Sequence, residues 1–215
     1  MSTFFSGDKS IHIDQHEPTT PGRHPAILLL HGSGGNVSFW SDRIAPHLTR
    51  LNVAFYAVHY FDRTGTTRAA YADIIDGHHF PAWLSAIADA LAYIRTRPNI
   101  DPNRIALLGI SLGAFLSLAL ATDPATNIRA IVEISGGLPD PYAANATSAF
   151  PPTLILHGGA DTFVTVSDAH KLEAQLTALN VPHETHIFPN QGHWFDSPTQ
   201  LQILLATARF LSQHL

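Results

Sequence analysis

The segment IALLGISLGAFLSLAL, from Ile105 to Leu120, decides how the rest of the chain is interpreted. It is almost wholly apolar, yet a lone hydroxyl, that of Ser111, stands in its middle with Gly109 and Gly113 two residues away on either side. A continuous apolar run before the serine is typical of a fully buried strand, and the apolar run after it is typical of a helix covered on most sides. The segment therefore predicts a sharp strand-to-helix junction with Ser111 at the turn.

Short apolar runs alternate with helical patterns along the remaining chain. The apolar runs predict strands at residues 25–32, 52–60, 104–110, 129–135, 153–158 and 183–189, with 11–18 as a further candidate for an edge strand. The helical patterns predict helices at residues 38–48, 81–97, 111–122, 167–179 and 199–214. Because strands separated by helices form parallel sheets covered on both faces, we expect an α/β fold with a mostly parallel, twisted sheet.

Two of the predicted helices carry further expectations. Ser167 has the residue type of an N-cap and is expected to begin the helix that ends near residue 179. The last helix is expected to face the core with its most hydrophobic stripe, which consists of Leu201, Leu204, Leu205, Ala208 and Leu211.

Composition limits the classes of protein to which the chain can belong. Its 215 residues, 45% hydrophobic and 13% charged, suit one domain over residues 1–215 with a large core. The absence of cysteine excludes disulfides, thiolate metal sites and a cysteine nucleophile. A net charge of −5 without a basic run argues against nucleic acid and against an anionic membrane surface as partners. No secretion signal or membrane-length apolar run is visible, so we expect a soluble, cytoplasmic protein.

The five residues around Ser111 match the G-x-S-x-G pattern of a nucleophile elbow. Glycine suits both flanking positions, because bulky side chains there would strike the neighbouring strand or helix. The helix that begins at the serine also points the positive end of its dipole at the reaction centre. The pattern alone is weak evidence, and the predicted strand before it and helix after it give it meaning.

A serine hydroxyl is a weak nucleophile at neutral pH and requires a base. In folds that use this elbow, the chain order is serine, acid and histidine, with the last two after late strands. Asp161 follows the strand predicted at 153–158, and His193 follows the strand predicted at 183–189. Order, strand position and loop context agree, so we expect a catalytic triad of Ser111, Asp161 and His193.

Other acidic and histidine residues are less well placed for these roles. Asp168 falls in a predicted helix, and Asp196 follows the histidine in the chain. His183 and His186 lie within a strand pattern, where packing or an edge position is expected. Their spacing is one residue short of the zinc motif H-E-x-x-H, so no metal site is expected there.

A reaction at an ester carbonyl also needs donors for the oxyanion, which are usually two backbone N–H groups. One is expected from Leu112, directly after the nucleophile. The second is expected from Ser33, in the loop HGSGGN at residues 31–36 after the first core strand. The alternative for this loop is a glycine-rich turn or a phosphate cradle, although it matches neither G-x-G-x-x-G nor the P-loop pattern.

The segments HGSGG, YFDRTG, GISLG, HGGAD and GHWF occur in this order along the chain. With them, residues 26–215 resemble the dienelactone hydrolase family of the α/β-hydrolase superfamily. The resemblance implies an α/β-hydrolase fold without a large cap domain and a hydrolase of small esters or lactones that needs no cofactor. The enzyme that names the family has a cysteine nucleophile and a glutamate in the loop after the first core strand. This chain has Ser111 and no carboxylate at residues 33–36, which implies a general carboxylesterase.

Aromatic residues near the expected active-site edge are candidates for the substrate pocket, with core packing as the alternative. These candidates are Tyr60, Phe61, Phe80, Trp83 and Trp194. Glu133 lies in a strand expected to be buried, where a structural hydrogen bond is favoured over a catalytic role. Residue types leave open a peptidase, a thioesterase, an acyltransferase or a catalytically silent binding protein, and they leave the oligomeric state open.

Overall fold

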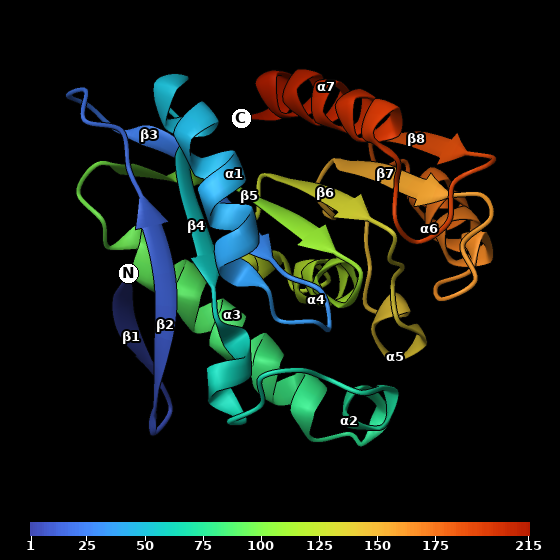
Figure 1. The fold of residues 1–215 in the computed structure, drawn as a ribbon, viewed down its shortest axis with the longest axis horizontal. Coiled ribbons are helices and arrows are strands. Elements are labelled where there is room, and N and C mark those ends of the chain that lie inside the picture. Colours follow the sequence, from blue (N-terminus) through green and yellow to red (C-terminus); the bar gives the residue numbers. More distant parts are fainter. The chain divides into compact units, whose positions relative to one another are not determined.

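The computed structural model describes residues 1–215, which divide into two compact units, Met1–Ile105 and Ala106–Leu215. Both units contain strands and helices (Figure 1). The boundary falls inside strand β5, Ile100–Ile110, a few residues before Ser111. The prediction that residues 1–215 make a single domain stays a prediction.

The first unit contains four strands in the order β1-β2-β4-β3. They are β1 Ser2–Ser6, β2 Lys9–His16, β3 His24–Leu30 and β4 Ala54–Val58. The pairs β1–β2 and β2–β4 are antiparallel, and β3–β4 is parallel. The helices of this unit are α1 Val37–Arg50, the 3-10 turn η1 Tyr60–Arg63, α2 Tyr71–Ile75 and α3 His79–Arg95. Every residue of β4 is buried, so this strand lies at the centre of the unit.

The second unit is wholly parallel, in the order β5-β6-β7-β8. Its other strands are β6 Ala130–Ile134, β7 Thr153–Gly158 and β8 His183–Phe188. Its helices are α4 Leu112–Ala121, the 3-10 turn η2 Pro124–Thr126, α5 Asp140–Ala143, α6 Val166–Ala178 and α7 Ser197–His214. Figure 1 shows α7 on one side of β6, β7 and β8, with α4 and α6 on the other. Residues that follow β5, β7 and β8 therefore leave the sheet at one edge, where parallel strands place their carboxyl ends.

The α/β architecture predicted from the sequence, with a mostly parallel sheet, is confirmed. Strand β1, the short helices α2 and α5 and the two 3-10 turns were not predicted, because their segments are too short to establish a period. None of the seven α-helices combines the length and the apolar character needed to cross a membrane.

The predicted start of α6 was wrong by two positions. The helix begins at Val166 with Thr165 as its N-cap, and Ser167 lies inside the first turn. The carbonyl oxygen of Thr165 accepts the N–H of Asp168 at 2.9 Å. The Thr165 side chain makes no capping hydrogen bond to the helix, and its hydroxyl lies 2.6 Å from Oγ of Ser167, so the two hydroxyls pair with each other.

The predicted inward face of α7 was also wrong. Leu204 and Leu205 are each 61% exposed, Leu201 is 56% exposed and Ala208 is exposed, while only Leu211 of the expected set is buried. The face that packs on the sheet is formed instead by Thr199, Ile203, Thr207, Phe210 and Leu211. Two threonines belong to this face, so a count of apolar residues favours the wrong stripe of the helix.

Candidate active site

Ser111 occupies the turn between β5 and α4 with φ 54° and ψ −118°. A positive φ in a residue other than glycine is strained by about 1–3 kcal/mol and persists only when its surroundings hold it. Here the Ser111 N–H donates to the carbonyl oxygen of Ile134 in β6 at 2.8 Å. The carbonyl oxygen of Ser111 accepts the N–H groups of Ala114 at 2.8 Å and Phe115 at 3.2 Å. The neighbouring strand and the first turn of α4 thus fix the serine in a strained strand-to-helix turn, the geometry expected for the G-x-S-x-G pattern.

Gly109 lets α4 approach β5 closely at this turn. A Cβ atom at Gly109 would lie 2.4 Å from both the carbonyl oxygen of Gly113 and Oγ of Ser117, and 2.6 Å from Cα of Ala114. Two of these three atoms belong to backbone, so a larger residue would force the helix away from the strand. The steric reason given for the first glycine of the motif is therefore confirmed.

The structure brings Ser111, Asp161 and His193 together. Nδ1 of His193 lies 2.7 Å from Oδ2 of Asp161, and Nε2 of His193 lies 3.0 Å from Oγ of Ser111. The side chain of His193 is 8% exposed and that of Asp161 is fully buried. Because an ionised carboxylate only accepts hydrogen bonds, Nδ1 carries the imidazole proton and Nε2 is left to accept from the serine hydroxyl. A hydroxyl, a base and a carboxylate are thus connected in one line.

The acid is held by its own loop. Oδ1 of Asp161 accepts the N–H groups of Phe163 at 2.8 Å and Val164 at 3.0 Å, which leaves Oδ2 for the imidazole. Behind this loop, Nε2 of the buried His157 donates to the carbonyl oxygen of Val164 at 2.9 Å. Sequence reasoning missed His157, although it is the first residue of HGGAD and stands in a strand predicted to be buried.

A second loop, which carries His193, packs directly on the first. The N–H of Gly159 donates to the carbonyl oxygen of Phe188 at 2.8 Å, and the N–H of Ala160 donates to that of Gln191 at 2.9 Å. A Cβ atom at Gly158 would lie 2.3 Å from the carbonyl oxygen of Gly192. Glycine at the end of β7 therefore permits the approach that sets the distance between acid and base.

The two predicted oxyanion donors lie in different units. Leu112 is the first residue of α4 and 3% exposed, and its N–H is among those that a helix leaves without an intrahelical acceptor. Ser33 lies between β3 and α1, where its carbonyl oxygen accepts the N–H of Ala69 at 2.9 Å. Their roles as donors stay predictions.

Four of the five pocket candidates are buried in the first unit, namely Tyr60, Phe61, Phe80 and Trp83. Tyr60 stacks on His31 with ring centroids 4.1 Å apart, and its hydroxyl donates to the carbonyl oxygen of His31 at 2.6 Å. Burial lowers the pKa of His31 to about 4, so this imidazole is neutral at pH 7. Nε1 of Trp83 donates to Oγ1 of Thr64 at 2.8 Å. These contacts fit the alternative of core packing, and a role in a pocket stays a prediction.

The fifth candidate, Trp194, is 73% exposed beside His193. Phe163, two residues beyond the acid, is 78% exposed and also contacts the His193 ring. Sequence reasoning missed Phe163, and its place two residues after HGGAD was the only available signal.

Glu133 is fully buried in β6. Its Oε2 accepts the N–H of Gly136 at 2.9 Å, which is the structural hydrogen bond expected from the sequence, while Oε1 has no partner. Burial, together with the nearby charge of Asp168, raises the pKa of this carboxyl to about 8, although the hydrogen bond from Gly136 acts in the opposite direction. Glu133 is therefore mostly protonated at neutral pH.

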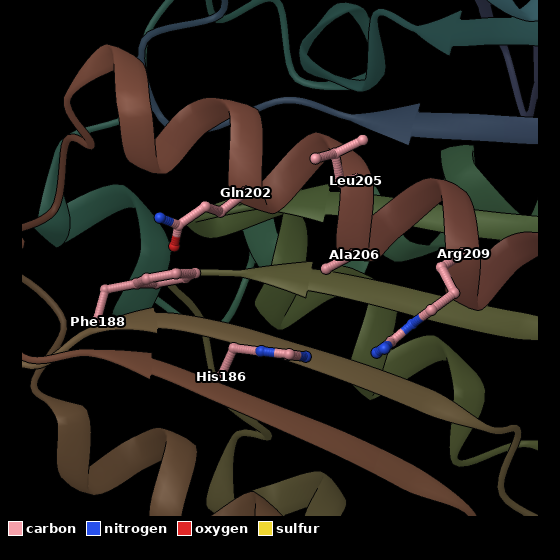
Figure 2. A pocket seen from close by; sticks show the side chains of 6 residues that line it. All are labelled: His186, Phe188, Gln202, Leu205, Ala206 and Arg209. Atoms are coloured by element: carbon pink, nitrogen blue, oxygen red, sulfur yellow. The ribbon is translucent and has the colours of Figure 1, made fainter.

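The rival residues have other surroundings. Asp196 caps α7, where its Oδ1 accepts the N–H of Thr199 at 2.9 Å, and Asp168 lies in the first turn of α6. His186 lines a cavity of about 300 Å³ between β8 and α7, and Glu184 contacts both His186 and Arg209. Figure 2 shows the residues that line this cavity, which are His186, Phe188, Gln202, Leu205, Ala206 and Arg209. None of them belongs to the predicted triad, and no group of three or more histidine or acidic side chains is arranged to hold a metal ion.

Comparison with known families adds an independent line of evidence. The sequence model of the dienelactone hydrolase family matches residues 15–207. The chain belongs to the dienelactone hydrolase family. The five segments quoted above all lie within the matched range, so the resemblance inferred from them is confirmed.

Two curated proteins give further likenesses to this dienelactone hydrolase family member. A Mycobacterium tuberculosis protein named "Putative phosphoribosyl transferase" is 29% identical over 172 residues, which are 77% of this chain but only 37% of that protein. A Synechocystis protein named "Putative carboxymethylenebutenolidase" is 26% identical over 197 residues, or 83% of this chain and 78% of that protein.

A solved structure extends the likeness to the fold. It belongs to a dienelactone hydrolase-like promiscuous phosphotriesterase from metagenomic libraries. The TM-score is 0.82 at 19% sequence identity, over 99% of this chain and 96% of that one. At this identity the likeness shows the fold alone, and the α/β-hydrolase fold implied by the resemblance is confirmed.

Proposed function

We propose that the chain is a serine hydrolase that cleaves small carboxylic esters or lactones through an acyl-enzyme on Ser111. The observation that carries this proposal is the line of hydrogen bonds from Asp161 through His193 to Ser111, with distances of 2.7 and 3.0 Å. Membership of the dienelactone hydrolase family supports the reaction type. The Synechocystis relative named as a carboxymethylenebutenolidase supports an ester or lactone as substrate.

In the first half of the proposed reaction, Nε2 of His193 takes the proton of Ser111 while Oγ attacks the carbonyl carbon of the substrate. The carbonyl oxygen becomes an oxyanion, which the N–H of Leu112 and the positive end of α4 stabilise. Asp161 fixes the imidazole tautomer and stabilises the imidazolium ion. The oxyanion then re-forms the carbonyl, the bond to the alcohol oxygen breaks, and His193 gives its proton to that oxygen.

In the second half, His193 takes a proton from water, which attacks the acyl-enzyme carbonyl. The intermediate collapses, the bond to Oγ breaks, and the proton returns from His193 to Ser111. The products are a carboxylic acid and an alcohol, which stay joined as one hydroxy acid when the substrate is a lactone. The enzyme thereby returns to its starting state.

A panel of p-nitrophenyl esters of rising chain length, together with simple lactones, tests this function in the full chain. We expect turnover of the shorter esters, and Ser111→Ala should lower kcat by about 10⁴-fold or more because no other hydroxyl replaces Oγ. A fluorophosphonate should label the parent at Ser111. Ser212→Ala, on the exposed side of α7, should retain the parent rate. Parent-level rates in Ser111→Ala would overturn the proposal, and so would neither turnover nor labelling in the parent.

A further inference from the structure

Two large aromatic side chains are exposed beside the proposed base. Phe163 is 78% exposed and Trp194 is 73% exposed. Their ring centroids lie 5.5 Å and 5.2 Å from that of His193, at interplanar angles of 51° and 82°. Rings of this size release free energy when they are covered, so two exposed ones at a reactive histidine indicate a surface that a ligand covers.

Both rings are positioned by contacts that also place the triad. The N–H of Phe163 donates to Oδ1 of Asp161 at 2.8 Å, so the backbone of this aromatic residue is fixed by the acid itself. Trp194 follows His193 in a loop that is closed by Gln191 and Asp196. The Gln191 side chain donates to the Asp196 carboxylate at 2.9 Å and accepts the Asp196 N–H at 2.9 Å. These bonds fix the backbone of both aromatic residues beside the triad, with Phe163 two residues after Asp161 and Trp194 directly after His193.

The chemistry of the base says which part of a substrate these rings would meet. Nε2 of His193 protonates the leaving oxygen, so the alcohol part of an ester must lie on the histidine side of the reacting carbon. The acyl part extends from that carbon in the other direction. Side chains that contact the His193 ring are thus neighbours of the alcohol, and aromatic rings favour apolar and aromatic groups.

We propose that Phe163 and Trp194 form the binding surface for the alcohol part of the substrate, and that the preferred substrates are esters of aromatic alcohols. This inference rests on the proposed serine hydrolase function. The alcohol is held by apolar contact before the reaction and in the transition state alike. Loss of either ring should therefore raise KM and leave kcat nearly unchanged.

Three esters, namely benzyl acetate, ethyl acetate and ethyl phenylacetate, distinguish binding of the alcohol part from binding of the acyl part. Benzyl acetate and ethyl acetate share an acyl group and have alcohols of similar leaving ability, so they differ mainly in the aromatic ring on the alcohol. Ethyl phenylacetate carries its ring on the acyl group instead. We expect Phe163→Ala and Trp194→Ala each to raise KM for benzyl acetate by about tenfold, and to raise KM for the two ethyl esters much less, because ethyl covers less of the rings.

Further variants distinguish a contact surface from a structural role. Phe163→Leu and Trp194→Phe should recover most of the lost affinity for benzyl acetate, because they restore apolar area. Phe5→Ala removes a side chain that is 76% exposed on β1 and should leave all three esters unaffected. Circular dichroism and thermal unfolding of each variant check that the fold is retained.

The outcomes separate this inference from the function on which it rests. Equal losses on all three esters, or a loss confined to ethyl phenylacetate, would overturn the alcohol surface while Ser111-dependent hydrolysis stands. Unchanged KM for benzyl acetate in both alanine variants would also overturn the alcohol surface. It would indicate that the exposed rings bind a protein or lipid partner instead. No Ser111-dependent hydrolysis of any ester by the parent would overturn both proposals.

Discussion

At the scale of single residues, the two oxygens of Asp161 have separate tasks. Oδ1 accepts two backbone N–H groups, and Oδ2 faces the imidazole of His193. The division matters because it fixes how any amide placed there would orient. An asparagine would keep its carbonyl oxygen toward the two N–H groups and turn its NH₂ group toward His193.

Asp161→Asn should therefore invert the tautomer of the base. Facing a donor, Nδ1 of His193 becomes the acceptor, so Nε2 carries the proton and cannot take one from Ser111. We expect kcat on p-nitrophenyl acetate to fall by about 10⁴-fold, with the thermal midpoint changed little. A kcat within tenfold of the parent would contradict the proposed role of Asp161.

The proximity of Ser111, Asp161 and His193 could be predicted from the sequence because each follows a strand, and strand ends are visible as apolar runs that stop. Phe163 and His157 could not, because nothing in the chain says which way a loop side chain points or which buried imidazole supports a neighbouring carbonyl. The expected partner of Glu133 was found for a different reason. A buried carboxyl must have a hydrogen-bond donor, whatever its identity.

At the scale of elements, the geometry of the site depends on how two loops approach each other. Gly158 ends β7 at the point where the loop of His193 crosses it, and the nearest atoms to its missing Cβ are backbone oxygens. Backbone atoms cannot rotate out of the way as a flexible side chain does. The fit between β7 and the last loop therefore sets the position of the base relative to the acid.

Gly158→Ala should move the loop of His193 outward. We expect a displacement of the base by about 1 Å, which lowers kcat by about 10²-fold. The affinity of the variant for a fluorophosphonate, before it reacts with Ser111, should change less. Gly77→Ala is the control, because Gly77 has φ 73° and open space around it. It should lower stability through backbone strain and leave kcat unchanged. Equal kcat losses in both variants would show that general destabilisation is the cause.

Helix α7 shows where an element's existence can be predicted and its orientation cannot. The hydrophobic periodicity of the sequence predicted the start of this helix to within two residues, yet the stripe of leucines faces outward. Hydrophobicity ranks Leu204 above Thr207, but Thr207 lies on the same face as Ile203 and Phe210 and is buried with them, its hydroxyl included. Which face of a helix packs on its sheet depends on contacts with other elements, and the periodicity of a single segment carries no information about them.

Substitutions in α7 should follow the observed face. Phe210 is 1% exposed, so Phe210→Ala should lower the free energy of unfolding by about 3–5 kcal/mol. Leu204 is 61% exposed, and Leu204→Ala should change it by no more than about 0.5 kcal/mol. Urea denaturation of both variants checks this order, and the reverse order would restore the face predicted from the sequence.

At the scale of the whole molecule, the buried Glu133 makes global stability depend on pH. Its pKa is about 8 in the folded chain, against 4.5 as the ordinary value, because burial disfavours the charged form. Between these two pH values the unfolded chain releases the proton and the folded chain keeps it. Unfolding therefore becomes easier as the pH rises through this window, by up to about 1.4 kcal/mol per pH unit, and the effect levels off above the folded pKa.

Glu133→Gln should remove this dependence while its side-chain oxygen still accepts the N–H of Gly136. We expect the free energy of unfolding of the variant, relative to the parent, to increase steadily from pH 5 to pH 8 and then to stay level. Guanidinium denaturation at pH 5, 6.5, 8 and 9 measures this difference. A difference that does not vary with pH would mean that the carboxyl keeps its ordinary pKa in the folded chain.

The positive φ of Ser111 makes the proposed catalytic activity and the stability of the fold compete at one residue. Glycine adopts such dihedral angles freely, so Ser111→Gly should unfold less readily than Ser111→Ala by about 1 kcal/mol, although neither has a nucleophile. Selection for heat resistance alone would thus favour glycine at this position. A serine there keeps the proposed nucleophile in a chain that is slightly less robust than the glycine variant.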